Sequence, residues 1–261
     1  MLGSAAVATL GVALTLLLDD GEAAPCSGSC KPPPFTAGWS YQLQDTPRII
    51  RSARVYDVDG FDTPKSYVSR LHKLGGYAIC YVSAGTWENW RPDRQRFPSS
   101  LLGRSNGWPG ERWLDIRRLD ALTPIMSDRI ATCRRKGFDA VEPDNVDGYA
   151  NETGFPLTAA DQLRYNRRLA NLAHHAGMAV GLKNDLDQAL ELRNHFDFAV
   201  VEQCFQYDEC DKVRPFTRIG KPVFEVEYEL PSSDFCARAR QLRVNALKAD
   251  LELDRPGTPC R

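Results

Sequence analysis

The chain has 261 residues, of which 43% are hydrophobic and 26% are charged, a composition typical of globular proteins and not of disordered or collagen-like chains. Its 33 basic and 34 acidic residues nearly cancel, which argues against a dedicated nucleic-acid binder. The length suits one large α/β domain or two small ones.

The N-terminus predicts a secretory signal peptide over residues 1–23. Residues 2–18 are apolar or small, and a small residue, Ala23, precedes the expected cleavage point. No basic residue precedes Lys31, and the apolar run is just long enough for a marginal membrane anchor, so a retained N-terminal anchor is the alternative. We expect a secreted, extracellular protein with no stable membrane partner, in which a Pro-rich lead-in (24–36) precedes a single domain (37–261).

The eight cysteines agree with export, because an even number in an exported chain favours disulfides. Sequence alone does not fix their connectivity, and our hypothesis joins near neighbours. The four pairs are Cys26–Cys30, Cys80–Cys133, Cys204–Cys210 and Cys236–Cys260. No Cys-x-x-Cys occurs and the four histidines lie in helix-like stretches, so we predict no metal site.

Short β-branched or aromatic runs alternate with longer amphipathic patterns along the chain. The expected strands are Trp39–Leu43, Arg54–Val58, Tyr77–Ser83, Ala140–Asp144, Ala179–Asn184, Phe198–Cys204, Pro222–Tyr228 and Ala246–Leu251, and Trp113–Ile116 is either strand or loop. The expected helices are Lys65–Leu74, Ala121–Lys136, Ala159–Ala176, Leu186–Asn194 and Ser232–Asn245. Thr158 and Asp161 form a capping box before the third helix, while Gly137 and Gly177 suit helix ends.

Eight strands alternating with helices predict a parallel sheet covered on both faces. At this length a single-domain α/β fold of the (β/α)8 TIM-barrel type is the leading architecture, and a doubly wound open sheet is second. No Gly-x-Gly-x-x-Gly follows the first strand, which disfavours nucleotide binding.

The stretch from Gly85 to Arg112 is long for a loop and rich in Trp, Pro and Gly. Loops of this length in a compact domain are usually functional. Trp87 and Trp90 lie in this stretch and are candidates for stacking on a ligand. We therefore expect this segment to form one wall of a cleft.

Polar residues collect where the predicted strands end, and in a barrel these ends face one common mouth where active sites lie. Any one of these carboxylates could be the buried partner of an arginine or a backbone amide, since an unpaired carboxylate in an apolar strand costs desolvation free energy. The convergence of the whole set points to a site. The residues are Tyr41, Gln42, Asp57, Asp59, Tyr81, Ser83, Glu142, Asp144, Asn145, Asp147, Lys183, Asn184, Asp185, Glu202, Gln203, Glu225 and Glu227.

Several carboxylates at one mouth, without metal-ligand histidines, indicate acid/base chemistry on a sugar. Glycosidic cleavage needs one protonated carboxyl to assist the leaving oxygen and one ionised carboxylate to attack or to activate water. Asp144 and Glu202, from the fourth and sixth strands, could face each other across the mouth. Glu142 with Glu202, and Asp144 with Glu227, stay open as pairs because Pro143 makes the fourth strand's regularity doubtful.

The motifs resemble those of glycoside hydrolase family 114, which contains endo-α-1,4-polygalactosaminidases. The resemblance extends from about Trp39 to Leu251. It rests on YDVDGFDT (56–63), CYVSAGTWENWRPD (80–93), WPGERWLDIR (108–117), GFDAVEPDNVDGY (137–149), GFPLT (154–158), GLKND (181–185), FDFAVVEQC (196–204) and VFEVEY (223–228).

The resemblance implies a (β/α)8 barrel and an exported, endo-acting glycoside hydrolase that cleaves α-1,4 links in polygalactosamine or galactosaminogalactan. Its catalytic pair would fall on Asp144 in VEPDN and Glu202 in VVEQC. A partly deacetylated, cationic amino-sugar polysaccharide fits a carboxylate-rich mouth, in which Lys183 is the main positive group. The expected substrate-binding residues are Tyr41, Asp57, Tyr81, Trp87, Asp115, Glu142, Asn145, Lys183, Asn184 and Glu227.

We expect a monomer that needs no cofactor or metal and binds no nucleic acid. The alternative function is a non-catalytic sugar-binding or wall-associated protein on the same barrel. A retaining mechanism requires the two carboxyl groups to lie about 5–5.5 Å apart, and inversion requires roughly 6.5–9.5 Å. Side chains from strands separated by one intervening strand can approach across the mouth. We therefore predict retention, with Asp144 as nucleophile and Glu202 as general acid/base.

Overall fold

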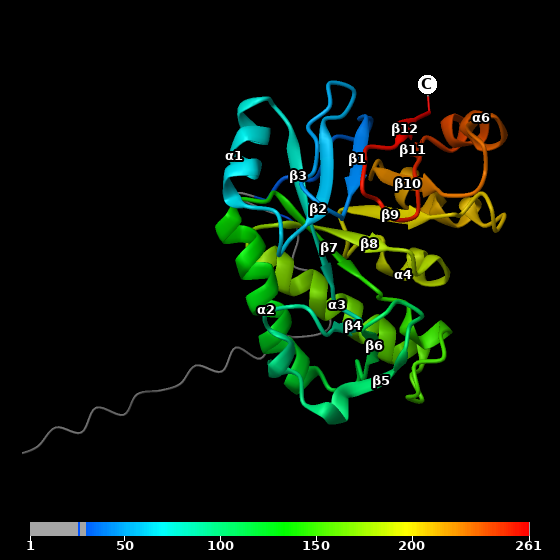
Figure 1. Ribbon diagram of the computed structural model, residues 1–261. Coiled ribbons are helices and arrows are strands. Elements are labelled where there is room, and N and C mark those ends of the chain that lie inside the picture. The colour runs from blue at the N-terminus through cyan, green and yellow to red at the C-terminus, as the bar shows by residue number, and fades with distance from the viewer. Residues whose placement is uncertain (1–25, 27–29, 261) are drawn as a thin grey trace, which may run out of the picture.

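The computed structural model describes Cys26 and residues 30–260. Its main element is a sheet of eight parallel strands that is extended by one short antiparallel strand (Figure 1). The parallel strands, in their order across the sheet, are β1 (Trp39–Gln42), β2 (Val55–Asp59), β3 (Tyr77–Ser83), β7 (Ala140–Asp144), β8 (Ala179–Lys183), β9 (Phe198–Glu202), β10 (Val223–Glu227) and β11 (Asn245–Lys248). The ninth, β12 (Thr258–Pro259), pairs with β11.

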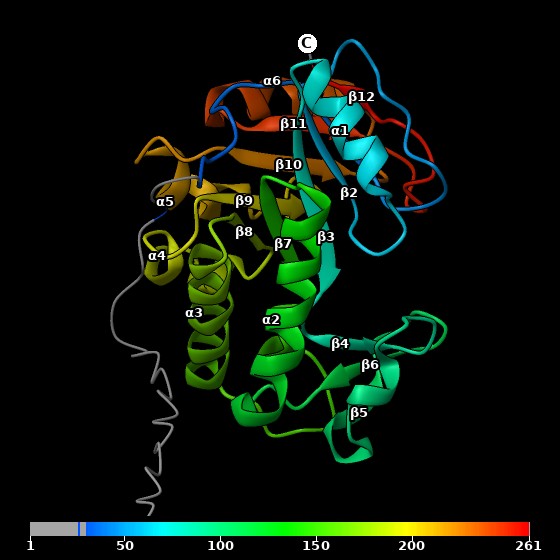
Figure 2. The same cartoon turned by 90° about the vertical axis from the view of Figure 1, so that its left-hand side faces the viewer.

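Helices connect most of these strands and cover the outside of the sheet. They are α1 (Lys65–Lys73), α2 (Leu119–Lys136), α3 (Ala159–His175), α4 (Ala189–Leu192), α5 (Arg214–Thr217) and α6 (Ser232–Leu242). Figure 2 shows α2 and α3 side by side next to β7 and β8. This arrangement confirms the predicted (β/α)8 barrel.

The helix boundaries follow local sequence signals. Thr158 and Asp161 form the predicted capping box of α3. Gly137 ends α2 in the left-handed conformation, at φ 95°. Two helices are shorter than expected: α6 stops at Leu242 because Arg243 adopts a left-handed conformation, and the segment expected over 186–194 divides into a 3-10 turn and the short α4.

Strand alternation determines which side chains reach the barrel interior. Along β9, Phe198 and Val200 belong to the interior cluster, whereas Ala199 and Val201 pack outward in the cluster that contacts the helices. Because successive residues face opposite sides of a strand, Glu202 continues the interior row. The same alternation places Asp144 in the row of Ala140, and Lys183 in the row of Ala179. Three chemically important side chains therefore point toward the mouth of the barrel.

The barrel seam lies between β11 and β1, and side-chain and loop contacts hold it together. Asn245 of β11 accepts a hydrogen bond from the Ala37 N–H at 3.0 Å and donates one to the Phe35 carbonyl at 3.0 Å. The Leu43 N–H also donates to the Leu253 carbonyl at 3.0 Å. These bonds replace a strand ladder, since none joins β1 to β11 in the described residues.

The stretch expected to be a long functional loop contains a small antiparallel sheet in the order β4-β6-β5, which we call the insert sheet. Its strands are β4 (Thr86–Glu88), β5 (Leu102–Ser105) and β6 (Glu111–Leu114), with 3-10 turns at Arg94–Arg96 and Ser99–Leu101. The segment Trp113–Ile116, for which the sequence allowed either strand or loop, is therefore partly strand, since β6 ends at Leu114. Figure 2 shows the insert sheet beyond the end of β3.

All four predicted disulfides are present: Cys26–Cys30, Cys80–Cys133, Cys204–Cys210 and Cys236–Cys260. The Cys204–Cys210 bridge closes the turn directly after β9, which carries Glu202. The predicted signal peptide, residues 1–23, lies outside the described residues. Among those residues, no helix combines the length and apolarity needed to cross a membrane.

Candidate active site

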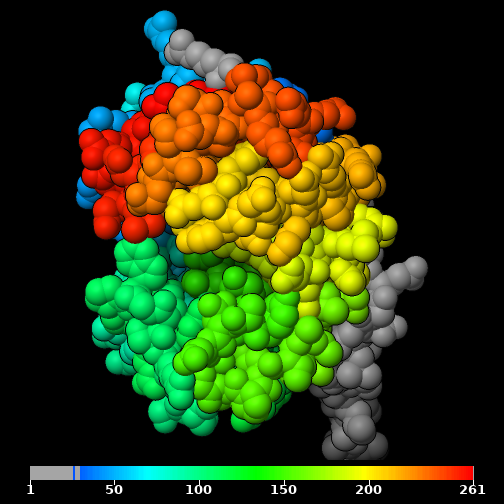
Figure 3. All heavy atoms as spheres, turned by 90° about the vertical axis from the view of Figure 1, so that its right-hand side faces the viewer, coloured from blue at the N-terminus to red at the C-terminus, as the bar shows by residue number. Residues whose placement is uncertain are grey.

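A cavity of about 650 Å³, here called the main cavity, opens at the C-terminal ends of the strands and is bordered by the insert sheet. Figure 3 shows this side of the molecule, which is hollowed between its upper and lower parts. Eight of its lining residues are acidic and two are basic. The acids are Asp59, Asp62, Glu88, Glu111, Asp144, Asp147, Glu202 and Glu252, and the bases are Arg91 and Lys183.

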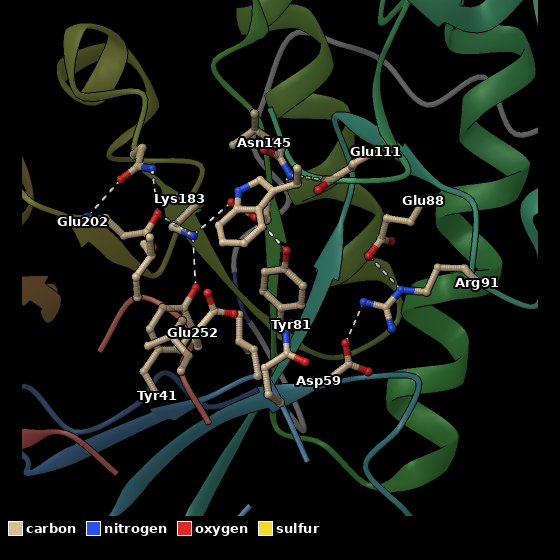
Figure 4. Close-up of a pocket in the computed structure, with 18 of the residues that line it drawn as sticks. Tyr41, Asp59, Tyr81, Glu88, Arg91, Glu111, Asn145, Lys183, Glu202 and Glu252 are labelled. Carbon is tan, nitrogen blue, oxygen red and sulfur yellow. Dashed lines mark hydrogen bonds and ion pairs between the residues drawn. The ribbon is translucent and has the colours of Figure 1, made fainter. Parts of the chain in front are cut away.

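Lys183 lies at the centre of the site and joins three carboxylates. Its Nζ is 2.9 Å from Asp144 Oδ1, 3.2 Å from Glu142 Oε1 and 3.2 Å from Glu202 Oε2. It also donates to the Tyr41 hydroxyl at 3.0 Å (Figure 4). Burial disfavours the charged lysine, yet the three carboxylates outweigh burial and raise the pKa of Lys183 well above its usual range. These contacts therefore favour Lys183 as a buried cation.

Asp144 is held as an ionised carboxylate. Its Oδ2 accepts hydrogen bonds from the Tyr81 hydroxyl at 2.8 Å and from the Asn145 amide at 3.2 Å, while Oδ1 faces Lys183. Burial alone would raise the pKa of Asp144, but the charge and hydrogen bond of Lys183, together with Tyr81, lower it. An ionised, hydrogen-bonded carboxylate at a cavity wall has the properties of a nucleophile.

Glu202 is the most exposed of the three carboxylates around Lys183. Its side chain is 27% exposed, against 15% for Asp144 and 0% for Glu142. The Tyr228 hydroxyl donates to its Oε1, and the Asn184 amide donates to its Oε2 at 3.4 Å. The Asn184 side chain also accepts the Glu202 backbone N–H at 3.0 Å, so the two residues orient each other.

Glu142 and Asp57 lie beneath Lys183 in the barrel interior and do not line the main cavity. Both are fully buried. The Tyr41 hydroxyl donates to Glu142 Oε1 at 3.2 Å. Burial raises the pKa of Glu142 to about 7, and burial followed by the charge of Glu142 raises that of Asp57. Glu142 can therefore hold a proton near neutral pH, and it contacts Lys183 from below at 3.2 Å.

Strand β7 stays regular through Pro143, which pairs with Val82 of β3. On the other side, pairing with β8 ends at Val141, so the missing N–H of the proline breaks no bond there. Regular alternation places Glu142 and Asp144 on one face, and both reach Lys183. The irregularity that we considered from the sequence is therefore absent.

The residues that follow β7, β8 and β9 share an unusual backbone conformation. Asn145, Asn184 and Gln203 have φ values of 61°, 49° and 56°, in the left-handed region that non-glycine residues seldom adopt. Gly85 packs against the first of these turns, where a Cβ atom would lie 1.6 Å from the Asn145 carbonyl oxygen. Strained backbone of this kind clusters at functional sites.

Seven of the predicted site residues line the main cavity together: Tyr41, Tyr81, Asp144, Asn145, Lys183, Asn184 and Glu202. Five others, which are Asp57, Trp87, Asp115, Glu142 and Glu227, do not line it. Asp115 pairs with Arg117 at 2.7 Å, and Glu227 accepts the backbone N–H of Phe205 at 2.8 Å. These two carboxylates act as structural partners, which is the alternative that burial in a strand suggested.

Trp87 is displaced from the cleft by strand alternation. In β4, Thr86 and Glu88 are buried, so Trp87 lies on the opposite face, where its indole N–H donates to the Arg94 carbonyl at 3.0 Å and its ring packs on the core. Trp90 and Trp108 line the main cavity instead and are 49% and 45% exposed. The segment does form the expected wall, with other aromatic residues.

The insert sheet contributes two acidic residues that were not among the predicted site residues. Glu111 and Glu88 lie on adjacent strands in register and line the main cavity. Buried Arg91 joins this wall to the barrel, because it contacts Glu88 at 2.8 Å and Asp59 at 2.6 Å (Figure 4). The alternation of residues in Thr86-Trp87-Glu88 could have predicted a strand with Glu88 on its buried face, but we expected this segment to be a loop.

The chain is similar to known proteins over nearly its full length. The model of glycoside-hydrolase family GH114 matches residues 21–261. The crystal structure of Aspergillus fumigatus Ega3 in complex with galactosamine is 36% identical, with a TM-score of 0.84 over 90% of this chain and 99% of that chain. The glycoside hydrolase domain of PelA from Pseudomonas aeruginosa is 14% identical, with a TM-score of 0.67 over 85% and 97%, which shows a shared fold alone. No curated protein matches the chain.

Removing the buried cation tests its structural importance. We expect Lys183→Met to lower the free energy of unfolding at neutral pH by about 3–5 kcal/mol, because it leaves buried carboxylates uncompensated. The deficit shrinks in acid, where the carboxylates bind protons. Urea denaturation measures both effects. The control is Lys212→Met, since this lysine is 41% exposed between Asp187 and Glu209 and its loss costs about 1 kcal/mol or less. Equal losses in the two variants would contradict the central position of Lys183.

The raised pKa of Glu142 predicts a pH-dependent stability. Above its ordinary pKa of 4.5, the unfolded chain releases a proton that the folded protein keeps up to about pH 7. The contribution of Glu142 to stability is therefore fully present below pH 4.5 and is lost as the pH rises through about 7. Glu142→Gln cannot ionise, so its free energy of unfolding falls less steeply over this range. Denaturation curves at several pH values test this, with exposed Glu252→Gln as control, and parallel pH profiles for wild type and Glu142→Gln would refute it.

Proposed function

The chain belongs to glycoside-hydrolase family GH114, and from this membership we propose that it cleaves α-1,4 links within galactosamine-containing polysaccharide, using Asp144 and Glu202. Membership of a glycoside hydrolase family favours an enzyme over the alternative, a sugar-binding protein without turnover. The observation that carries the proposal is the pair of carboxylates on either side of Lys183. The similarity to Ega3, whose crystal structure contains galactosamine, supports the substrate.

The charge of the main cavity supports a cationic substrate. Its acidic side chains outnumber its basic ones by eight to two. Both basic side chains, Lys183 and Arg91, already contact acidic partners. Such a cleft attracts a chain of protonated amino sugars and concentrates it at the mouth. The exposed rings of Trp90 and Trp108 provide flat surfaces on which sugar rings can pack.

Two distances to Lys183 limit the separation of the catalytic carboxylates. Asp144 Oδ1 and Glu202 Oε2 lie 2.9 Å and 3.2 Å from the same Nζ, so they cannot be further apart than the sum of these distances, 6.1 Å. For these two facing oxygens, a separation of 6.1 Å or less favours the about 5–5.5 Å spacing of carboxyl groups in retaining enzymes over the roughly 6.5–9.5 Å spacing in inverting enzymes. It supports a retaining mechanism.

In this mechanism Asp144 attacks the anomeric carbon while the carboxyl group of Glu202 gives its proton to the glycosidic oxygen. The carbon–oxygen bond to the leaving sugar breaks, and a covalent glycosyl ester on Asp144 forms. Glu202 then removes a proton from water, and the water oxygen replaces Asp144 on the anomeric carbon. Lys183 keeps Asp144 ionised before the first step and stabilises the carboxylate that the second step releases, and Tyr81 and Asn145 orient its second oxygen.

The catalytic proposal predicts a severe loss of turnover on soluble polygalactosamine when either carboxylate is replaced. We expect Asp144→Asn and Glu202→Gln each to lower kcat by about 10³-fold or more, because each removes an acid and keeps its shape. The control is Asp208→Asn, which removes an exposed acid that does not line the main cavity. Reducing-end assays and circular dichroism separate activity from folding.

Near wild-type turnover in a folded Asp144→Asn or Glu202→Gln variant would remove that residue from the catalytic pair. The wild-type reaction, followed by proton NMR, should release α-anomers first, as retention of an α-link requires. Initial release of β-anomers would refute the retaining assignment and leave the carboxylate roles to be reassigned.

We also propose that the chain is exported after cleavage of residues 1–23. Four disulfides support an oxidising compartment. N-terminal sequencing of the protein recovered from the culture medium should begin at Ala24. Cell-associated protein that keeps residues 1–23 would instead support the retained anchor.

A further inference from the structure

A second cavity of about 330 Å³ adjoins the main cavity. The two share Asp147, Asn184 and Glu202, but Asp144 lines only the main cavity. Glu202 therefore stands at the boundary between them. The other residues of the second cavity are Tyr149, Ala150, Asp185, Leu186, Asp187, Gln203, Tyr207, Glu209 and Lys212.

The position of Glu202 determines which sugar the second cavity would hold, and this step rests on the proposed function. A general acid lies beside the glycosidic oxygen, whereas the nucleophile lies beside the anomeric carbon of the sugar that becomes esterified. A cavity that contains Glu202 without Asp144 is thus on the leaving-group side. A sugar chain bound across both cavities would place its scissile bond between them.

The charges of the second cavity are only partly compensated. Lys212 lies 2.7 Å from Asp187 and 3.0 Å from Glu209, so these two acids already have a cation. Asp147 and Asp185 have no ion-pair partner in the described part of the chain. Two carboxyl groups of the same cavity therefore lack a counter-ion.

Asp185 has the surroundings expected of a ligand-binding carboxyl group. The residue is only 4% exposed, and its Oδ2 accepts a hydrogen bond from the Asn166 amide at 2.8 Å, whereas its Oδ1 accepts none from the described residues. Burial and the charge of Asp147 raise the pKa of Asp185 to about 8, and burial raises that of Asp147 to about 6. Both shifts arise from burial among other acids, and a cation bound beside the two carboxyl groups would oppose them.

Tyr207 adds an apolar surface to the same cavity. It follows the Cys204 end of a disulfide, and its residue surface is 64% exposed, which is unusual for a large aromatic side chain. Tyrosine combines a flat ring that can pack on the face of a sugar with a hydroxyl group that can reach its oxygens.

We propose that the second cavity is a leaving-group subsite for an amino sugar whose 2-amino group is free and protonated. Asp185 and Asp147 bind the ammonium group, and Tyr207 packs on the sugar ring. An N-acetylated unit lacks the positive charge and carries an acetyl group that leaves the two carboxyl groups unsatisfied. The enzyme therefore selects a deacetylated unit directly after the bond that it cleaves.

Partially N-acetylated polygalactosamine tests this selection, because the leaving-group sugar becomes the new non-reducing end. Digestion in ¹⁸O-labelled water marks each new reducing end, and tandem mass spectrometry then identifies both ends of every product. We expect wild-type products to begin with galactosamine far more often than with N-acetylgalactosamine. Asp185→Asn should reduce this preference by about tenfold, the effect of removing one charged hydrogen bond, and should leave the composition of the new reducing ends unchanged.

The control variant is Asp208→Asn, which removes an exposed acid next to Tyr207 that does not line the cavity. Its end composition should match wild type. If Asp185→Asn does not fold, Tyr207→Ala provides the second variant, and we expect it to raise KM for the polymer more than it lowers kcat.

The outcomes separate this proposal from the proposed function. A wild-type enzyme that releases no products from the polymer contradicts the proposed function. Products with unselected non-reducing ends, or a selection that Asp185→Asn leaves intact, overturn the subsite while the hydrolase assignment stands.

Discussion

One buried ammonium group shared by three carboxylates is the constraint on which this site depends. Like charges a few ångströms apart repel strongly where water is excluded, and Glu142, Asp144 and Glu202 all lie within 3.2 Å of Lys183 Nζ. The barrel meets this constraint by bringing β7, β8 and β9 together, since β8 lies between the other two. Lys183 therefore both permits Asp144 and Glu202 to lie close together and limits their separation.

These three acids differ in how deeply they are buried, and this gives them different chemical properties. Glu142 is fully buried and keeps a proton up to about pH 7, so it adds little negative charge in acid. Asp144 receives donors on both oxygens and stays ionised, and Glu202 has the most exposed side chain. In the proposed mechanism the same residue type thus serves as support, nucleophile and acid/base, because each position differs in depth and in hydrogen-bond donors.

Much of this arrangement could be predicted from the sequence, because it follows from regular alternation. The eight strands, the disulfides, and the meeting of Asp144, Lys183 and Glu202 at one mouth all came from periodicity, spacing and family motifs. Two features of the site could not be predicted from the sequence. Trp87 faces away from the cleft because residue-by-residue alternation decides sides in β4, a strand that we expected to be a loop. The depth of each acid in the barrel could not be predicted either, since nothing in the sequence VEPD distinguishes fully buried Glu142 from the more exposed Asp144.

The surplus of acids along the cleft connects stability to substrate choice. In the main cavity only Lys183 and Arg91 offset eight acidic residues, and in the second cavity Asp147 and Asp185 have raised pKa values because they are buried with other acids. Such crowding destabilises the free protein, and bound ammonium groups would relieve it. A neutral polysaccharide of the same shape would fill the space without relieving the repulsion. In the proposed function, recognition of a cationic chain is thus a property of the whole cleft, to which the proposed catalytic pair adds only the site of cleavage.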